Sequence, residues 1–358
     1  MKLGLFMMPF HDASRPVADL IDEDLDKIIL ADGLGYSEAW VGQHYTATVE
    51  PVASPLMLMA AALPRTQQIT FATGVINLPC HNPAVVAAEI AQFDHMSRGR
   101  LIFGIGPGAL ASDFELFNNT DGWPRLHKAL ESIETIKKIW ASEPPYDIEG
   151  EYYSVKLRDS VNEELGTGYI QKPFQLPHPP IASSLMSPFP GLGAIAGENR
   201  WIPISANFIP TSSVASHWVK YLEGAAKAGY EPDPSIWRVA RNIVVAPTDQ
   251  EARDVAMDPQ GGMYATYDYL WKALSLGGFQ GALKSDPDFP DDQMTTEKLI
   301  EDLVVFGSPA TVVEKLKAFQ EVTGPFGTLI LGLQDWGHNT EKERRSMELL
   351  ATDVQPHL

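Results

Sequence analysis

The chain has 358 residues, 44% of them hydrophobic, which is enough for one large domain with a sizeable core. Its 27 basic and 46 acidic residues give a net charge of −19, which argues against nucleic acid or an anionic membrane surface as a partner. The single cysteine, Cys80, excludes an intrachain disulfide, and with no long apolar segment in the sequence it favours a cytoplasmic location.

Short apolar runs alternate with amphipathic segments over the first 140 residues. The expected strands are Leu3–Met7, Glu38–Val41, Ile69–Ile76 and Leu101–Ile105. Apolar residues at helical spacing, with proline or glycine near several ends, predict helices at Leu20–Leu34, Pro55–Leu63, Pro83–Met96 and Pro124–Trp140.

Two segments interrupt this alternation. Residues 143–180 are rich in proline, glycine and charge, and the alternating run Tyr152–Leu157 within them is typical of an exposed hairpin strand. Residues 258–296 hold glycine pairs and an acidic, proline-containing run, and we expect an irregular segment that acts as a mobile lid.

The alternation resumes between and after these segments. Strands are expected at Ile181–Ser184, Trp201–Ile204, Val239–Ala246 and Thr328–Leu333. Helices are expected at Leu192–Asn199, Ser213–Ala228, Thr248–Ala256, Pro309–Val322 and from about Glu341.

Eight strands, each followed by a helix, define the expected fold class. The strands are apolar without clean alternation, which indicates a parallel sheet covered on both faces. In a chain of this length the pattern favours an α/β fold in the form of a TIM-like (β/α)8 barrel. We therefore expect one barrel domain over residues 1–358, with insertions at about 143–180 and 258–296.

Gln43-His44-Tyr45 directly follows the second expected strand. In a barrel of this type, chemistry takes place at the carboxyl ends of the strands. A histidine there can act as an acid, a base or a hydrogen-bond donor near neutral pH. The alternative is that His44 only satisfies a buried contact, and the local sequence by itself favours that interpretation.

Two further strand ends carry candidate binding residues. Gly104-x-Gly106-x-Gly108 lacks the spacing of a dinucleotide fingerprint, and we interpret these glycines as letting a flat ligand approach the backbone. The run Ser183–Pro188 precedes a helix, where hydroxyls and backbone amides can hold a phosphate; an ordinary capping loop is the alternative. The histidines show no metal-ligand spacing, so no metal site is expected, and there is no G-x-S-x-G elbow of a serine hydrolase.

Five stretches, taken in order, resemble the bacterial luciferase-like flavin-dependent monooxygenases, and the limonene monooxygenase-like branch is the nearest match. They are Leu34–His44, Thr73–Pro83, Phe93–Arg100, Gly106–Asp113 and Ala182–Pro188. The resemblance covers nearly the whole chain.

The resemblance implies a barrel that uses reduced FMN, supplied by a separate NAD(P)H-dependent flavin reductase, and O2 as co-substrate. Through a flavin C4a-peroxide, such an enzyme oxygenates a small apolar, carbonyl or heteroaromatic compound. The catalytic histidine of the family falls on His44, and a non-proline cis peptide of the family falls on Gly74–Val75. A homodimer is also implied.

The resemblance, together with the strand-end positions, assigns residues to two sites. The expected FMN-binding residues are Gly74, Val75, Asn77, Gly106, Ser183, Ser184, Met186 and Ser187. The residues expected around the substrate are Met8, Phe10, Trp40, Gln43 and Tyr45.

The chain departs from the family pattern at two positions. Gln43 stands where the family commonly has a glutamate, and Pro107 stands where luciferases have a phosphate-binding arginine. Two other functions therefore stay open: a deazaflavin-dependent oxidoreductase that transfers hydride on the same fold, and a non-catalytic flavin-binding relative.

Overall fold

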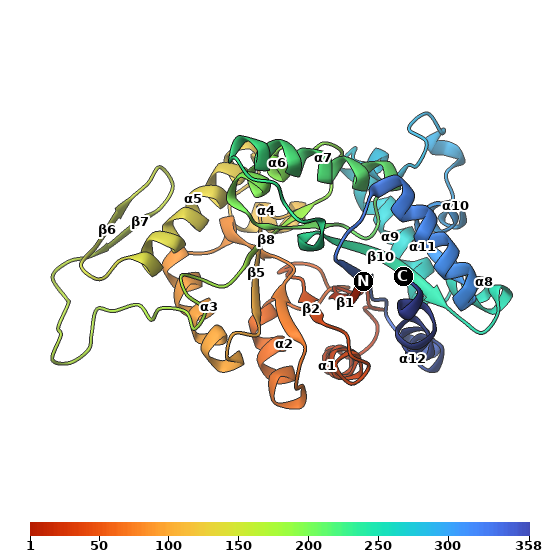
Figure 1. The fold of residues 1–358 in the computed structure, drawn as a ribbon, viewed down its shortest axis with the longest axis horizontal. Helices are drawn as coiled ribbons and strands as arrows, with labels where there is room; N and C mark the ends of the chain where they lie inside the picture. The colour runs from red at the N-terminus through yellow and green to blue at the C-terminus, as the bar shows by residue number, and fades with distance from the viewer.

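The computed structural model describes residues 1–121 and 124–358 in full and residues 122 and 123 by their backbone alone. Within these residues, eight parallel strands form a closed barrel (Figure 1). They are β1 (Lys2–Met7), β2 (Glu38–Val41), β3 (Thr70–Thr73), β5 (Leu101–Gly106), β8 (Ile181–Leu185), β9 (Ile202–Ser205), β10 (Arg238–Val245) and β12 (Thr328–Gly332). Because β12 pairs with both β1 and β10, and β10 pairs with β9, the ring closes. The prediction of a TIM-like barrel is confirmed.

Helices surround the barrel, and those expected from the sequence form within a few residues of their expected ends. They are α1 (Val17–Gly33), α2 (Pro55–Ala62), α3 (Pro83–Ser97), α5 (Gly122–Ala141), α6 (Gly191–Asn199), α7 (Thr211–Lys227), α8 (Asp249–Ala256), α11 (Pro309–Thr323) and α12 (Thr340–Leu349). Three helices were not expected: α4 (Ala111–Leu116), α9 (Gly262–Leu276) and α10 (Thr296–Leu303). A short strand, β11 (Val305–Gly307), pairs with β10.

The third strand is shorter than expected. It ends at Thr73, a cis peptide joins Gly74 to Val75, and a two-residue strand, β4 (Ile76–Asn77), follows and pairs with β5. The cis peptide was expected at this bond. A Cβ on Gly104 would lie 1.8 Å from the carbonyl oxygen of Thr73, and one on Gly106 would lie 2.7 Å from a methyl of Val75. Gly104 therefore makes room for the neighbouring strand and Gly106 for the side chain of Val75, while the interpretation that glycines at this strand end admit a flat ligand stays a prediction for Gly106 and Gly108.

The barrel interior is filled by apolar side chains. One buried cluster gathers residues of most barrel strands: Trp40, Ala72, Ile102, Ala182, Ile202, Ile204, Ala240 and Ile330. At the amino ends of the strands, the indole Nε1 of Trp40 donates to Glu38 over 2.9 Å, and Arg238 pairs with Glu38 at 2.7 Å. The interior is thus packed and closed on that side, so the open end of the barrel is the carboxyl end of its strands.

Residues 143–180 form an arm that extends away from the barrel on the side opposite α8 and α10 (Figure 1). The run expected to be a hairpin strand becomes β7 (Ser154–Leu157), which pairs antiparallel with β6 (Tyr146–Glu149). The arm returns past α3, where the ring of Phe174 contacts His95.

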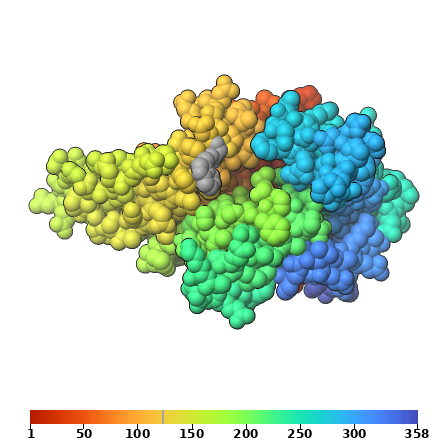
Figure 2. Space-filling model, turned by 90° about the horizontal axis from the view of Figure 1, so that it is seen from above, coloured from red at the N-terminus to blue at the C-terminus, as the bar shows by residue number. Residues whose placement is uncertain are grey.

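Residues 258–296 are more ordered than expected. The expectation of an irregular segment is wrong over α9, whose residues Met263, Tyr267 and Leu270 are buried in a second apolar cluster with α8 and α10. Figure 2 shows the surface hollowed between the orange, green and cyan parts of the chain, and α9 belongs to the cyan part. No described helix is long and apolar enough to cross a membrane.

Candidate active site

His44 lies at the carboxyl end of β2 and is held by a carboxylate from another loop. Its Nδ1 is 3.0 Å from Oδ2 of Asp113, which lies on α4 and is buried. Oδ1 of the same carboxylate accepts the backbone N–H of Tyr45 at 3.2 Å and the hydroxyl of Thr46 at 2.6 Å. These donors favour the carboxylate form of Asp113 and a proton on Nδ1 of His44, which leaves Nε2 for the barrel mouth.

A second carboxyl group, Glu50, faces the other ring nitrogen. Oε2 of Glu50 lies 3.7 Å from Nε2 of His44, whose side chain is 10% exposed. Burial, reinforced by the charge of Asp113, raises the pKa of Glu50 to about 8. His44 is therefore set between an ionised carboxylate and a carboxyl group that is neutral at pH 7.

Gln43 is a buried connector of three segments. Its Nε2 donates to the carbonyl of Ala53 and to the hydroxyl of Tyr45, both over 3.0 Å. Its Oε1 accepts the backbone N–H of Asn77 at 3.1 Å and lies 3.1 Å from Nε2 of His81. Because both backbone partners fix the amide orientation and the side chain is buried, Gln43 links these segments, which corrects the expectation that it lines a substrate pocket.

Aromatic and sulfur-containing side chains line the same end of the barrel. The ring of Tyr45 packs edge-on against Phe117 at 4.9 Å, and its hydroxyl lies 2.8 Å from Nε2 of His81. The ring of Phe10 lies 4.7 Å from that of Tyr269 on α9. Met8 is partly exposed and packs over Gly42, where a Cβ would clash with its sulfur.

Trp40 lies elsewhere. It is fully buried in the barrel interior and hydrogen-bonds to Glu38 near the amino end of its strand. The alternation of a strand explains this, because Trp40 and Glu38 share the inward face while Val41 faces outward. The expectation that Trp40 lines the substrate pocket is therefore corrected.

The residues expected to bind FMN fall into two groups. Gly74, Val75, Ser184 and Met186 are partly exposed and Ser187 is exposed, all at the carboxyl ends of β3 and β8. Asn77 is buried and donates its Nδ2 to the carbonyl of Gln43, and Gly106 is covered by Val75. Ser183 is fully buried, and its Oγ has no hydrogen-bond partner among the described residues.

The loop from Ser184 to Pro190 is fixed by a chain of hydrogen bonds from outside the barrel. Trp237 Nε1 donates to Ser205 Oγ at 3.0 Å, and Ser205 Oγ lies 2.8 Å from Nδ1 of His217. Nε2 of His217 lies 3.0 Å from the carbonyl oxygen of Ser187. Since the indole can only donate, the serine hydroxyl donates to Nδ1, and a neutral His217 donates from Nε2 to the loop.

Two observations agree with this arrangement of His217. Burial lowers the pKa of His217 to about 4, which keeps the ring neutral at pH 7. The neighbouring Ser216 accepts the backbone N–H of Phe189 at 2.8 Å, so α7 holds the loop at a second point. The loop runs into the amino end of α6, which has no side-chain cap; the backbone N–H of Gly193 donates to the carbonyl of Pro190.

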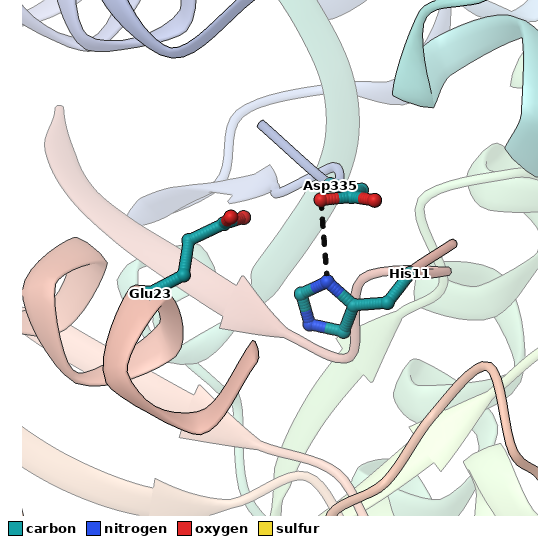
Figure 3. Close-up of side chains that lie close together, drawn as sticks. All are labelled: His11, Glu23 and Asp335. Carbon is teal, nitrogen blue, oxygen red and sulfur yellow. Dashed lines mark ion pairs between the residues drawn. The ribbon is translucent and has the colours of Figure 1, made fainter. Parts of the chain in front are cut away.

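A separate buried cluster lies beside the barrel mouth (Figure 3). His11, Glu23 on α1 and Asp335 after β12 offer ligand atoms within 4.8 Å of one another. However, Arg15 pairs with both Glu23 and Asp335, and Lys27 pairs with Glu23 at 2.7 Å. Because these cations already neutralise the carboxylates, the cluster is an ion-pair network that ties the loops after β1 and β12 to α1.

Asp113, Glu50 and His217 were missed in the sequence. Asp113 closes one of the stretches that carry the family resemblance, and an acid in the first turn of a short helix gives no local signal of a contact with His44. Glu50 precedes Pro51 in a loop, and His217 lies within a helix, so neither occupies a strand end. Only the folded chain brings them to the mouth and to the serine loop.

The fold and the His44 cluster define a (β/α)8 barrel with a histidine and two carboxyl groups at the carboxyl end of its strands. Residues 1–324 match the family described as luciferase-like monooxygenase. Limonene 1,2-monooxygenase of Rhodococcus erythropolis is 31% identical over 355 residues, which cover 99% of this chain and 86% of that protein. The chain belongs to the luciferase-like monooxygenase family.

Two further relatives match along the whole chain. The 3,6-diketocamphane 1,6-monooxygenase of Pseudomonas putida is 28% identical over 100% of this chain and 98% of its own length. A solved structure of the oxygenating constituent of 3,6-diketocamphane monooxygenase, described as a type II Baeyer–Villiger monooxygenase in complex with FMN, aligns with a TM-score of 0.89. It is 27% identical and covers 99% of this chain and 98% of that one.

Proposed function

We propose that this protein is an FMN-dependent monooxygenase that uses reduced FMN and O2 to oxygenate a small, largely apolar compound. The observation that carries the proposal is the His44–Asp113 pair, which lies after β2 at the carboxyl end of the strands in a barrel of the luciferase-like family. The FMN complex of the diketocamphane relative supports the choice of cofactor.

The residues present fit a flavin at the mouth. Gly74 and Val75 offer a partly exposed backbone surface, and the serine loop with the amino end of α6 offers neutral hydrogen-bond donors for a phosphate. The orphaned hydroxyl of Ser183 lies in the same strand end and is a buried donor without a partner among the described residues. When bound, reduced FMN supplies the electrons that activate O2.

His44 holds or moves a proton at the mouth. Its Nδ1 is committed to Asp113, so Nε2 is the atom that exchanges protons with the reacting groups. The rings of Tyr45, Phe10 and Tyr269 give this end of the barrel an apolar wall, which would limit the access of water to a bound reduced flavin. The same apolar wall favours an apolar, carbonyl or heteroaromatic substrate.

The proposal includes partners and location. The relative with the FMN complex is an oxygenating constituent, which supports reduced FMN delivered by a separate NAD(P)H-dependent flavin reductase. Exposed apolar side chains on α3 and the arm support a homodimer, namely Val85, Met96 and Phe174. Sedimentation equilibrium tests whether the protein is a dimer in solution. A single cysteine fits the reducing conditions of the cytoplasm.

Anaerobic titration tests the cofactor. We expect reduced FMN to bind, and to bind more tightly than an equal concentration of reduced deazaflavin cofactor, as followed by flavin fluorescence and absorbance. Binding of the deazaflavin with no affinity for reduced FMN would overturn the proposal in favour of hydride transfer. Binding of FMN with no oxygenated product from any compound of a broad panel would favour a non-catalytic relative.

A further inference from the structure

The loop after β2 folds back so that Glu50 faces His44. The backbone N–H of His44 donates to the carbonyl of Val52 at 3.1 Å, and the amide of Gln43 donates to Ala53 at 3.0 Å. The carbonyl of Val49 accepts the backbone N–H of His11 at 2.8 Å, which ties the loop to the strand end of β1. These hydrogen bonds to residues before and after Glu50 fix the backbone from which its side chain extends.

Glu50 lacks the partners that an ionised carboxylate requires. The residue is 5% exposed, and its Oε1 is buried with no hydrogen-bond partner among the described residues. Its Oε2 lies 3.7 Å from Nε2 of His44. Leaving a carboxylate unsatisfied in such a place is costly, so Glu50 retains its proton at neutral pH, with a pKa of about 8.

The groups around Glu50 come from four other segments. Asp113 on α4 disfavours a second negative charge, and burial acts in the same direction; His11 after β1 acts weakly in the opposite direction. Burial, together with the charge of Glu50, raises the pKa of the hydroxyl of Tyr269 on α9. His44 after β2 is therefore the group within reach that can accept a proton from Glu50.

We propose that Glu50 is a positioning residue that shares one proton with Nε2 of His44 and so replenishes the proton that His44 delivers at the barrel mouth. In this step the O–H bond of Glu50 breaks while an N–H bond forms at Nε2. A neutral carboxyl and a neutral ring become a carboxylate and an imidazolium, with no electron transferred. The two atoms must approach from 3.7 Å to about 3 Å for the transfer. The role of Glu50 rests on the proposed function at one point, namely that His44 transfers a proton at the barrel mouth.

Histidine nitrogen NMR on the flavin-free protein tests the shared proton. We expect the ring-nitrogen signals of His44 to respond when Glu50 loses its proton, near pH 8, and we expect Glu50→Gln to abolish this response because the amide cannot titrate. The matched control is Glu343→Gln, which removes another buried carboxyl, with a pKa raised by burial to about 7, on α12. The control should keep the response near pH 8. A response that persists in Glu50→Gln, or no response in the wild-type protein, would overturn the proposal.

A second measurement needs no stable Glu50→Gln protein. Carbon-13 NMR of glutamate carboxyl groups in the wild-type chain should show Glu50 neutral at pH 7 and titrating together with His44, with the resonance identified by its loss in Glu50→Asp. A Glu50 carboxyl that is already ionised at pH 6, or that titrates without any change at His44, would contradict the shared proton. Since neither experiment contains flavin, both outcomes are independent of whether FMN binds.

Discussion

His44 lies between two carboxyl groups that differ in their hydrogen bonds. Asp113 accepts three donors and orients the ring, whereas Glu50 has an oxygen without a partner among the described residues. Such an asymmetric pair separates an orienting role from a proton-carrying role, as in other sites where environment sets two carboxyl groups apart. The proposed role of His44 requires that Nδ1 stays hydrogen-bonded to Asp113 and that Nε2 can exchange a proton.

Replacing His44 by alanine should separate activity from stability. We expect His44→Ala to slow oxygenation by about 10²–10⁴-fold, because the proton-transferring group is lost. The free energy of unfolding should fall by only about 1 kcal/mol, since Asp113 keeps the donors of Tyr45 and Thr46. The control is His95→Ala, an exposed histidine on α3, which should change neither quantity. A matched loss of activity and stability would favour a histidine that only satisfies a contact.

Gln43→Glu tests the connector that replaces the usual glutamate of the family. A carboxylate cannot donate to the carbonyl of Ala53 or to Tyr45, so we expect a loss of about 1–3 kcal/mol in the free energy of unfolding at pH 8. Gln171→Glu makes the same change of charge at an exposed position and should be nearly neutral. Equal stability of both variants in denaturant titrations would show that the amide donors contribute nothing.

At the scale of elements, the site is assembled by contacts between loops and helices outside the barrel. The chain from Trp237 through Ser205 and His217 joins β10, β9 and α7 to the serine loop. The segment after β10 contributes in a similar way through α9. The hydroxyl of Tyr267 accepts a hydrogen bond from the amide of Asn242 on β10. The hydroxyl of Thr266 donates to the amide oxygen of Gln334, which follows β12. Positions remote from the mouth therefore set its shape.

His217→Leu should loosen the serine loop. Without the Nε2 donor, the carbonyl of Ser187 loses its partner, and we expect the affinity for reduced FMN to fall about tenfold through poorer pre-organisation of the loop. His217→Gln can still donate an N–H to this carbonyl and should recover most of the affinity. Calorimetric titration of both variants measures this, and equal affinity of the leucine variant and the wild type would contradict a positioning role.

The lid hypothesis now applies to a smaller part of residues 258–296. We expect slow amide hydrogen exchange in α9 from Met263 to Leu270, where one face is buried, and fast exchange over residues 277–292, most of which are exposed. Mass spectrometry of peptides from the two parts measures the difference. Equally slow exchange throughout would leave no mobile lid, and equally fast exchange would contradict the packing of α9.

At the scale of the whole molecule, the periodic features were predictable and the long-range contacts were not. The eight strands follow from short apolar runs, and His44 from its place after one of them. Trp40 lies in the interior rather than at the mouth because strand parity places it on the same face as Glu38. The glycine pairs at both ends of α9 are typical of irregular segments, so the local composition hides the helical spacing of the apolar residues between them. Asp113 and Glu50 depend on how loops fold back, which no local pattern encodes.

Oxygen-isotope labelling tests the central claim most directly. The protein, a general flavin reductase, NADH and FMN would be incubated under ¹⁸O2 with a panel of apolar, carbonyl and heteroaromatic compounds, and the products analysed by mass spectrometry. The account predicts a product that carries one ¹⁸O atom from O2, formed with wild-type protein and strongly reduced with His44→Ala. Products without ¹⁸O, or equal yields with both proteins, would contradict it.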